Sequence, residues 1–318
     1  MNCCKPIVAS LFLAFVHGAA AAASPVLDAA QAGMGGTAAA ASLENAAMTT
    51  NPSLIGLHRR YDFSGHARFG YDAATEWGVS AVDGRTSNWI TMGLLYRGYK
   101  AHPTLTTSDL PGWSIPGATP SNIKRRHDVI LALAGHVFQD RLAFGLSGTV
   151  LFYDHDRQGQ GSTGNMDAGL SAHATRFLVL GVAGRNLLPV EGSGDLPMSG
   201  VAGFRLYGDP GTIRADLEWQ DLNQDPWYSS GKNASPWTGA VGLERRFGNV
   251  TALRGGYRWS GPDGNMHRVT TGLGLMGPEG SIEFGAMIPV GPNEPTLRST
   301  AVLMTINLQA PDMDQVPF

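Results

Sequence analysis

The stretch "HDVILALAGHVFQDRLAFGLSGTVLFY", His127 to Tyr153, decides the fold. In its first half, Val129, Leu131, Leu133, Gly135 and Val137 share a face, and the opposite face carries Asp128, Ala132, Ala134 and His136. In its second half the apolar positions are Leu142, Phe144, Leu146, Gly148, Val150 and Phe152, opposite Ala143, Gly145, Ser147 and Thr149. A period of two is the side-chain period of a β-strand. Because only "QDR" separates the two halves, the stretch predicts a β-hairpin.

The same alternation recurs in segments of roughly ten residues along most of the chain. Fourteen such segments can be counted, beginning near Tyr61, Trp77, Trp89, His127, Leu142, Met166, Phe177, Met198, Thr212, Trp237, Val250, Met266, Ser281 and Ser299. An even number of antiparallel strands returns both ends of the chain to the same side, as bacterial outer-membrane barrels require.

The connections between these segments alternate in length. Those after the fourth, sixth, eighth, tenth and twelfth segments are tight, namely "QDR", "TR", "GDPG", "FGN" and "GPEG". Those after the odd-numbered segments from the third onward are longer, for example Gly98 to Arg126, "DHDRQGQGSTG" and "DLNQDPWYSSGKNASP". Short turns on one side and long loops on the other are typical of the periplasmic and extracellular ends of such barrels.

The two faces of the segments differ in polarity. In "TIRADLEWQ" the residues Ile213, Leu217 and Trp219 alternate with Arg214, Asp216 and Glu218, and no charged residue is expected within the apolar face of any segment. A soluble sandwich with one wet face would share this pattern. Small residues on the polar face and two aromatic girdles favour a membrane barrel: Trp77, Trp219, Trp237 and Trp259 near the long loops, and Trp89, Phe177 and Phe247 near the short turns.

The sequence therefore predicts an all-β fold, a transmembrane antiparallel barrel of about fourteen strands in the bacterial outer membrane. Its polar face would line the lumen and carries both signs of charge: Asp62, His66, Arg68, Arg97, Asp128, Asp167, His173, Arg205, Arg214, Asp216, Glu218, Glu244, Arg254, Arg258, Arg268 and Glu283. Mixed signs favour internal ion pairs over a selectivity ring of one sign. A specific ligand site among these charges is the alternative.

The first residues read as a secretory signal peptide, residues 1–23. Lys5 supplies the positive start, Ile7 to Val16 the apolar region, and the following alanines the cleavage site, after Ala23. Cys3 and Cys4 are the only cysteines, so the mature chain is expected to hold no thiol and no disulfide.

Charge and composition exclude two broad classes. Removal of Lys5 with the leader leaves 22 basic residues against 26 acidic ones, which gives no electrostatic footprint for nucleic acid. No apolar run of eighteen residues follows the leader, which excludes a helical membrane protein. The 42 glycines and the low charged fraction of 15% suit one large sheet.

Ahead of the strands lies "AGMGGTAAAASLENAAMTTNPSLIGL", Ala32 to Leu57. Gly33 to Ala38 matches the dinucleotide pattern G-x-G-x-x-A, but that pattern needs a strand before it and βαβ units around it, which are missing. The residues instead predict a compact plug, 24–57, that bends at its glycines and forms a helical turn or two. Asn51-Pro52 should end any helix there. The barrel would span 58–308 and a tail 309–318.

These residues resemble the N-terminal hatch of the FadL-type outer-membrane transporters of long-chain fatty acids and other hydrophobic compounds. The hatch of that family has a Gly-rich start, an acidic residue before alanine, and then Asn-Pro-Ala-Leu. Here the corresponding residues are Gly33, Gly35, Gly36, Glu44, Ala46, Ala47, Asn51, Pro52, Ser53 and Leu54. The resemblance implies a fourteen-stranded barrel, passive uptake of a hydrophobic ligand past the hatch, and release sideways into outer-membrane lipid.

The longest loop, Gly98 to Arg126, is the candidate for capturing a hydrophobic substrate, since it carries Leu105, Leu110, Trp113 and Ile115. An ordinary rim loop folded over the mouth is an equal alternative.

The sequence leaves three other functions to consider. A non-transporting barrel that docks secretion or surface-attachment machinery is the main alternative to a channel. An enzyme is not expected, because no G-x-S-x-G motif occurs and Ser147 has no assigned base, although His136 and His173 also face the lumen. Asp154, Asp156 and Gln158 begin like a calcium loop, but the twelfth position is Asn165, so no metal or cofactor is expected.

Overall fold

The structure is a computed structural model of the whole chain. It describes residues 28–40, 45–57, 60–70, 74–101, 123–137, 141–155, 159–188, 198–208, 210–221, 235–248, 250–261, 266–290 and 300–309. The predicted signal peptide and the residues after 309 lie outside these ranges.

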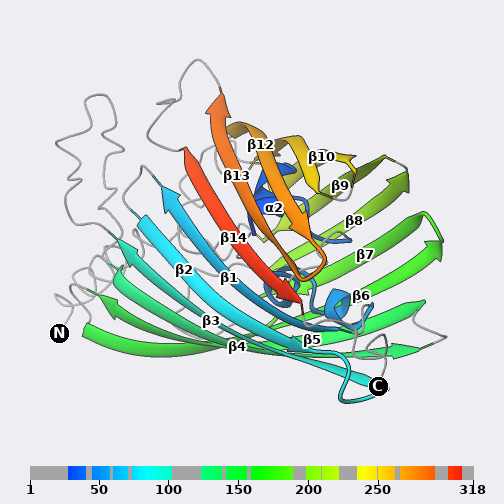
Figure 1. Cartoon of the computed structure of the whole chain (residues 1–318). Coiled ribbons are helices and arrows are strands. Elements are labelled where there is room, and N and C mark those ends of the chain that lie inside the picture. Colours follow the sequence, from blue (N-terminus) through cyan, green and yellow to red (C-terminus); the bar gives the residue numbers. More distant parts are fainter. Residues whose placement is uncertain are drawn as a thin grey trace, which may run out of the picture.

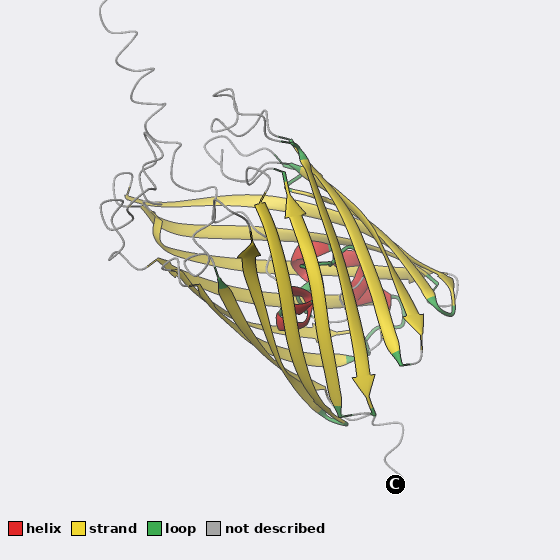
Figure 2. Cartoon of the chain, turned by 90° about the horizontal axis from the view of Figure 1, so that it is seen from above, coloured by secondary structure: helices red, strands yellow, loops and turns green. Residues whose placement is uncertain are grey.

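Fourteen antiparallel strands form one closed barrel, as predicted (Figures 1 and 2). Each strand pairs with its neighbours in sequence, and β1 pairs with β14 to close the sheet. The strands are β1 Tyr61–Gly70, β2 Ala74–Asp83, β3 Ile90–Ala101, β4 Ile123–Val137, β5 Leu142–His155, β6 Gly159–Thr175, β7 Leu178–Arg185, β8 Ser199–Gly208, β9 Gly211–Gln220, β10 Trp237–Phe247, β11 Thr251–Ser260, β12 Met266–Gly277, β13 Gly280–Val290 and β14 Ala301–Gln309.

The predicted hairpin is confirmed in its register and in its faces. Val129 pairs with Val150 and Leu133 with Leu146 across β4 and β5. Most of the predicted apolar positions are exposed on the outside of the barrel, except that Gly135 is buried and Leu142 is half-buried, whereas Asp128, Ala132 and Ala134 are buried inside it. The outer surface therefore carries a continuous set of large apolar side chains. A closed sheet with such a surface has no free edge and suits the outer membrane.

Some strand boundaries differ from the prediction. The segment "DHDRQGQGSTG" is mostly strand and not loop, because β5 runs to His155 and β6 begins at Gly159. Strands β3 and β4 likewise extend into the predicted loop Gly98 to Arg126, as far as Ala101 and from Ile123. An antiparallel ladder joins backbone groups whatever the side chains are, so strands continue past the point where apolar alternation stops.

The aromatic residues of the predicted girdles lie at strand ends or turns, and Trp219 pairs directly with Trp237. The expectation of an outer face without charges is wrong near strand ends. Arg245, two residues before the end of β10, is exposed with its guanidinium 5.5 Å from the centre of the Phe247 ring. Lys100, near the end of β3, is exposed too. Charges near the interfaces cost about 0 to 1 kcal/mol, much less than at mid-depth.

Residues 28–40 and 45–57, called here the N-terminal segment, lie inside the barrel (Figure 2). They form α2 Ala29–Gly33, α3 Ala47–Thr50 and the 3-10 helix η1 Pro52–Leu57. The α-helix ends before Asn51-Pro52, as predicted. In the described part of the chain no helix is long and apolar enough to cross a membrane.

Candidate functional site: the lumen and the N-terminal segment

The start of the N-terminal segment is attached to the inner faces of β12 to β14. Helix α2 begins at Asp28, whose side chain accepts a hydrogen bond of 2.6 Å from the backbone N–H of Gln31. The Ala29 N–H donates to Thr305 Oγ1 of β14 over 2.9 Å. Ala29 and Ala32 also pack against Ala301 and Leu303, which explains why β14 is apolar on both faces.

The glycines of the segment lie where its backbone contacts the barrel wall. A Cβ on Gly33 would lie 2.9 Å from the Cα of Gly272, so only hydrogen atoms fit between the two backbones. Gly35 has a φ of +74°, and a Cβ there would lie 2.6 Å from the carbonyl oxygen of Val241. Gly36 also has positive φ, at 77°. Glycine is the residue that combines this backbone conformation with such a close approach.

Thr270 of β12 holds the turn after α2. Its hydroxyl donates to the carbonyl oxygen of Gly33 over 3.0 Å and accepts from the Gly35 N–H over 2.8 Å. Both backbone groups are buried, and a buried backbone group without a partner costs free energy. One hydroxyl therefore satisfies a donor and an acceptor of the segment together.

Asp216 of β9 binds the next part of the segment and not an arginine. Its Oδ2 accepts hydrogen bonds from the backbone N–H groups of Ala38 and Ala39, over 2.5 and 2.8 Å. The expectation that Asp216 would join an internal ion pair is not met by these contacts, because the carboxylate neutralises orphan backbone donors instead.

Asn51 is the polar centre of the segment's second half. Its amide donates to the Ala39 carbonyl over 2.6 Å and to Ser171 Oγ of β6 over 3.0 Å, and its oxygen accepts from the Ser53 hydroxyl over 2.6 Å. The hydroxyls of Ser53 and Ser171 are 2.7 Å apart. Asn51 thus links three pieces of chain that are distant in sequence.

Around this polar centre the contacts are apolar. Met48, Leu54, Ile55 and Leu57 are buried in one cluster with residues of five strands: Val82, Leu95, Ile130, Ala132, Ala134, Ala143 and Val179. Small residues on the strands make room, as at Gly145, where a Cβ would overlap the backbone of Pro52 and Ser53. This half of the lumen is filled by side chains.

Ion pairs occupy the lumen on the long-loop side of the segment. Arg97 and Arg126 both bind Asp128, the latter over 2.7 Å, and Arg97 lies 3.6 Å from Glu76. Across the barrel Arg185 and Arg258 bind Glu218, at 2.5 and 3.6 Å. His66 and Arg68 approach Glu76 at 3.9 and 4.0 Å. Opposite charges are thus paired, as expected from the mixed signs.

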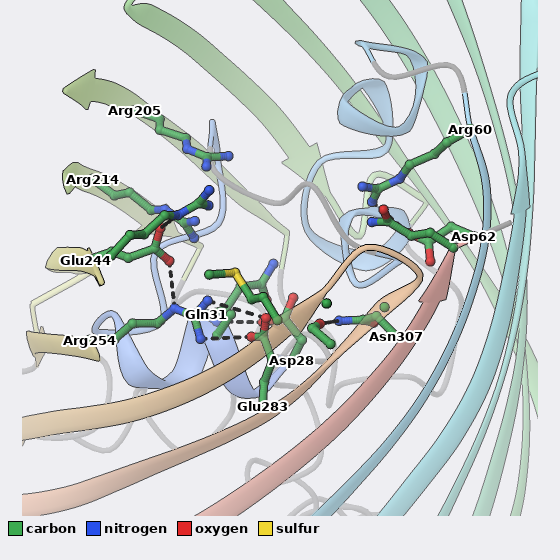
Figure 3. A pocket seen from close by; sticks show the side chains of 17 residues that line it. Asp28, Gln31, Arg60, Asp62, Arg205, Arg214, Glu244, Arg254, Glu283 and Asn307 are labelled. Carbon is green, nitrogen blue, oxygen red and sulfur yellow. Dashed lines mark hydrogen bonds and ion pairs between the residues drawn. The ribbon is translucent and has the colours of Figure 1, made fainter. Parts of the chain in front are cut away.

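A second set of charges lies on the short-turn side. Arg254 binds Glu244 over 2.8 Å and Glu283 over 2.9 Å, and Arg246 takes the other oxygen of Glu244 over 2.9 Å. Arg60 pairs with Asp62 over 2.7 Å. These residues line a cavity of about 230 Å³ beneath α2 (Figure 3), with Asp28, Gln31, Arg205, Arg214, Ser281, Asn307 and Gln309 among the other lining residues.

Several predicted site residues lie outside the described residues. These are Glu44 of the hatch pattern and Leu105, Leu110, Trp113 and Ile115 of the predicted capture loop. Residues Asp156 to Gln158 of the calcium-like motif do as well, and Gly159 belongs to β6. For these the sequence predictions remain predictions.

The residues weighed for an enzyme are not brought together by their described contacts. Ser147 hydrogen-bonds Asp167 over 3.4 Å, and Asp167 also accepts from the Asn186 N–H over 2.8 Å. His136 Nε2 lies 2.8 Å from the Asn88 carbonyl oxygen in the β2–β3 turn. A serine nucleophile would need a histidine within hydrogen-bond reach.

The sequence analysis did not identify five residues of the lumenal ion pairs: Arg60, Glu76, Arg126, Arg185 and Arg246. Glu76 and Arg126 precede the expected starts of their strands by one residue. Strand boundaries placed one residue earlier would have included both among the lumenal charges. It also missed Thr270, Thr305 and Ser171, whose signal is only that of small polar residues on the inward face.

No protein-family model matches the chain, and a search of curated proteins found no match. Solved structures match in fold. The Ralstonia pickettii toluene transporter TbuX is 14% identical with a TM-score of 0.62, over 92% of this chain and 99% of that chain. The Pseudomonas putida toluene transporter TodX is 12% identical with a TM-score of 0.62, over 93% and 100%.

A Pseudomonas aeruginosa FadL homologue is 12% identical with a TM-score of 0.58, over 90% of this chain and 98% of that chain. The chain therefore has the fold of the FadL-type transporters over nearly its whole length, which agrees with the resemblance of its hatch pattern. At these identities the likeness concerns the fold.

Proposed function

We propose that the protein is an outer-membrane channel for the passive uptake of hydrophobic small molecules, with the N-terminal segment controlling the lumen. The observation that carries this proposal is where the N-terminal segment contacts the barrel wall. Helix α2 contacts β11 to β14, and η1 contacts β3 to β6, so the segment reaches opposite parts of the wall. A polypeptide held across a lumen in this way has to move before a solute can pass it.

The fold supports the same proposal. Matching structures include toluene transporters and a monoaromatic hydrocarbon channel. Within a channel of this kind a solute would enter at the long-loop end and would meet the N-terminal segment in the lumen. Transport would run down the concentration gradient. Sideways release into lipid follows only from the family resemblance.

The proposed cargo is a hydrophobic molecule. Two classes of hydrophobic molecule are candidates. Long-chain fatty acids are implied by the resemblance of the hatch pattern, and monoaromatic hydrocarbons by the names of the matching structures. Parallel uptake assays with radiolabelled palmitate and toluene separate the two. If the predicted capture loop binds the substrate, the double substitution Leu110→Asp and Trp113→Asp should weaken uptake of whichever of the two compounds the protein transports.

A cysteine lock tests whether the segment must move. Ser53 and Ser171 face each other with their hydroxyl oxygens 2.7 Å apart, so cysteines at both positions can reach the disulfide bond length of about 2 Å. No other thiol is expected in the mature chain. In cells that lack other channels for these probes, we expect the oxidised S53C/S171C variant to take up cargo at least about tenfold more slowly than its reduced form.

The single variants S53C and S171C are matched controls and should not respond to oxidant. If wild type takes up the probe fast and oxidised S53C/S171C does so equally fast, residues 45–57 do not control the lumen. Uptake no faster than in cells without the protein would contradict the channel altogether. That result would favour the second candidate, a non-transporting barrel that docks secretion or surface-attachment machinery, whose support is the dense apolar packing of Met48, Leu54 and Ile55.

A further inference from the structure

The cavity beneath α2 contains polar groups that the ion pairs of the lumen do not satisfy. We propose that this cavity binds a small oxyanion between Arg214 of β9 and Gln31 of the N-terminal segment, and that the bound anion holds α2 against the barrel wall. The inference rests on the geometry of the cavity and not on the cargo of the channel.

Two arginines lie side by side on one wall of the cavity. Arg205 of β8 is the direct cross-strand partner of Arg214, and both side chains point into the barrel (Figure 3). They are nearly inaccessible, with 1% and 5% of their surfaces exposed. Like charges directly opposite on a sheet destabilise the pair. A buried pair of guanidinium groups therefore favours anions beside it, and Glu244 is one such anion.

Five arginines line the cavity and only four carboxylates, and each carboxylate has a partner other than Arg214, although Glu244 also lies close enough to Arg214 to interact with its charge. Both oxygens of Glu244 accept from Arg246 and Arg254, and Glu283 accepts from Arg254. Asp62 pairs with Arg60, and Asp28 caps α2. In the described part of the chain Arg214 forms no ion pair, and its Nε has no hydrogen-bond partner. The guanidinium of Arg205 lies 4.2 Å from the centre of the Tyr207 ring.

Gln31 supplies a second unsatisfied group, from the segment itself. Its side chain is 1% exposed, and among the described residues neither its Nε2 nor its Oε1 has a hydrogen-bond partner. A buried polar group without a partner costs about 1 to 3 kcal/mol. An oxyanion that accepts from Gln31 Nε2 and from the Arg214 guanidinium would satisfy these two donors and would link the segment to β9, and water in the cavity could donate to Gln31 Oε1.

The chemistry of the donors specifies the ligand class. A guanidinium and an amide N–H bind carboxylate and phosphate oxygens, with charge-assisted bonds from the guanidinium. The cavity volume of about 230 Å³ admits an ion of that size together with water. It lies at the short-turn end, which faces the periplasm in outer-membrane barrels, so the anion would come from there.

Binding of two probes, inorganic phosphate and acetate, to the purified mature protein tests the proposal. Comparison of the two probes distinguishes a phosphate ligand from a carboxylate ligand. We expect saturable binding of at least one probe by calorimetry, and about tenfold slower hydrogen exchange of the Ala32 amide in α2 when it is bound. Chloride at equal ionic strength should not slow this exchange. Arg214→Gln should weaken binding by about tenfold or more, and Gln31→Leu by a smaller factor.

Arg258→Gln is the matched control, because Arg258 lies in the ion pairs at the other end of the lumen and should leave anion binding unchanged. Heat-modifiable mobility on gels shows that each variant is a folded barrel. The proposal is overturned if neither probe binds saturably, if Arg214→Gln binds as wild type does, or if Arg258→Gln weakens binding equally. Binding without slower exchange in α2 would overturn the role in holding the helix.

Discussion

The two halves of the N-terminal segment are held in the lumen by different forces. Residues 45–57 pack Met48, Leu54 and Ile55 against apolar side chains of β2 to β5 and β7. Residues 28–40 have few such contacts and depend on close backbone approach at Gly33 and on hydrogen bonds to side chains of β9, β12 and β14. Beneath them lies the charged cavity.

This difference indicates which half can respond to its surroundings. Ions and other polar solutes do not compete for apolar contacts, because these contacts involve no charge and no hydrogen bond. Hydrogen bonds beside a polar cavity can be exchanged for bonds to water or to an ion at small net cost. We therefore expect residues 28–40 to open more readily than residues 45–57, with hydrogen exchange of backbone amides as the measure.

The largest effect is expected from Leu54→Ala. Leu54 is 2% exposed in the apolar cluster, and truncation of a buried leucine costs about 2 to 5 kcal/mol. The opening free energy of the Leu54 amide, which donates to the Asn51 carbonyl, should fall by about that amount. The Ala32 amide in α2 should exchange as in wild type.

Leu146→Ala is the control for this variant, because Leu146 faces outward and is 51% exposed. It should leave both amides unchanged. Equal loss of protection at Ala32 and Leu54 in Leu54→Ala would contradict the comparison, since the two halves would then open as one unit.

A smaller effect is expected from Thr270→Val, which keeps the shape of the side chain and removes its hydroxyl. The Gly33 carbonyl and the Gly35 N–H lose their partner, at a cost of about 2 kcal/mol. Exchange at Gly35 and Ala32 should accelerate, and exchange at Leu54 should not. If residues 28–40 control the lumen, uptake of the hydrophobic probe should also increase.

The neighbouring substitution Thr271→Val serves as its control. Thr271 is exposed on the opposite face of β12, and its hydroxyl makes only a long hydrogen bond of 3.5 Å to the Arg254 carbonyl. Unchanged exchange at Gly35 in Thr270→Val would show that the glycine contacts alone hold this half.

The smallest effect is expected from Gly256→Ala. The added methyl would overlap the backbone nitrogen of Gly35 and would lie 2.6 Å from the Met34 carbonyl carbon, so the turn after α2 must shift, at a cost of at least about 1 kcal/mol. Gly148→Ala is the control, because nothing lies within 4 Å of a Cβ at that position. Thermal stability of the barrel should be the same in both, while exchange at Gly35 should accelerate only in Gly256→Ala. Identical exchange in the two variants would mean that close packing at this wall does not stabilise α2.

Much of the barrel could be predicted because each strand and each tight turn is encoded by residues that are close together in the sequence. Alternation in each segment identifies the strand and its lipid face, and the tight turns identify neighbours. The turn in "GDPG" even sets Arg205 opposite Arg214, since Gly208 pairs with Gly211. The start of β6 could not be predicted, because Gly159 to Gly164 carry no apolar alternation and are strand only through pairing with β5.

The contacts of the lumen were less predictable. Asn51 and the glycines of the hatch pattern were recognised as a unit, but their partners were not. Thr270, Ser171 and Asp216 lie more than a hundred residues away in sequence, and any small polar residue on an inward face would have suited the pattern equally well. Asp216 was one of the lumenal charges for which mixed signs favoured internal ion pairs, and in the structure it accepts hydrogen bonds from two backbone amides.

By itself the sequence determined that a closed sheet forms and which side of each strand meets lipid, because a charge at mid-depth in the bilayer is too costly to be placed at random. Only the tertiary structure decided what the inward side chains do. The N-terminal segment brings its own donors and acceptors into the lumen, and which barrel residue meets each of them depends on where that segment rests. For Arg214 Nε and the side-chain amide of Gln31 the fold supplies a shared cavity and, among the described residues, no hydrogen-bond partner, which leads to the proposed anion site.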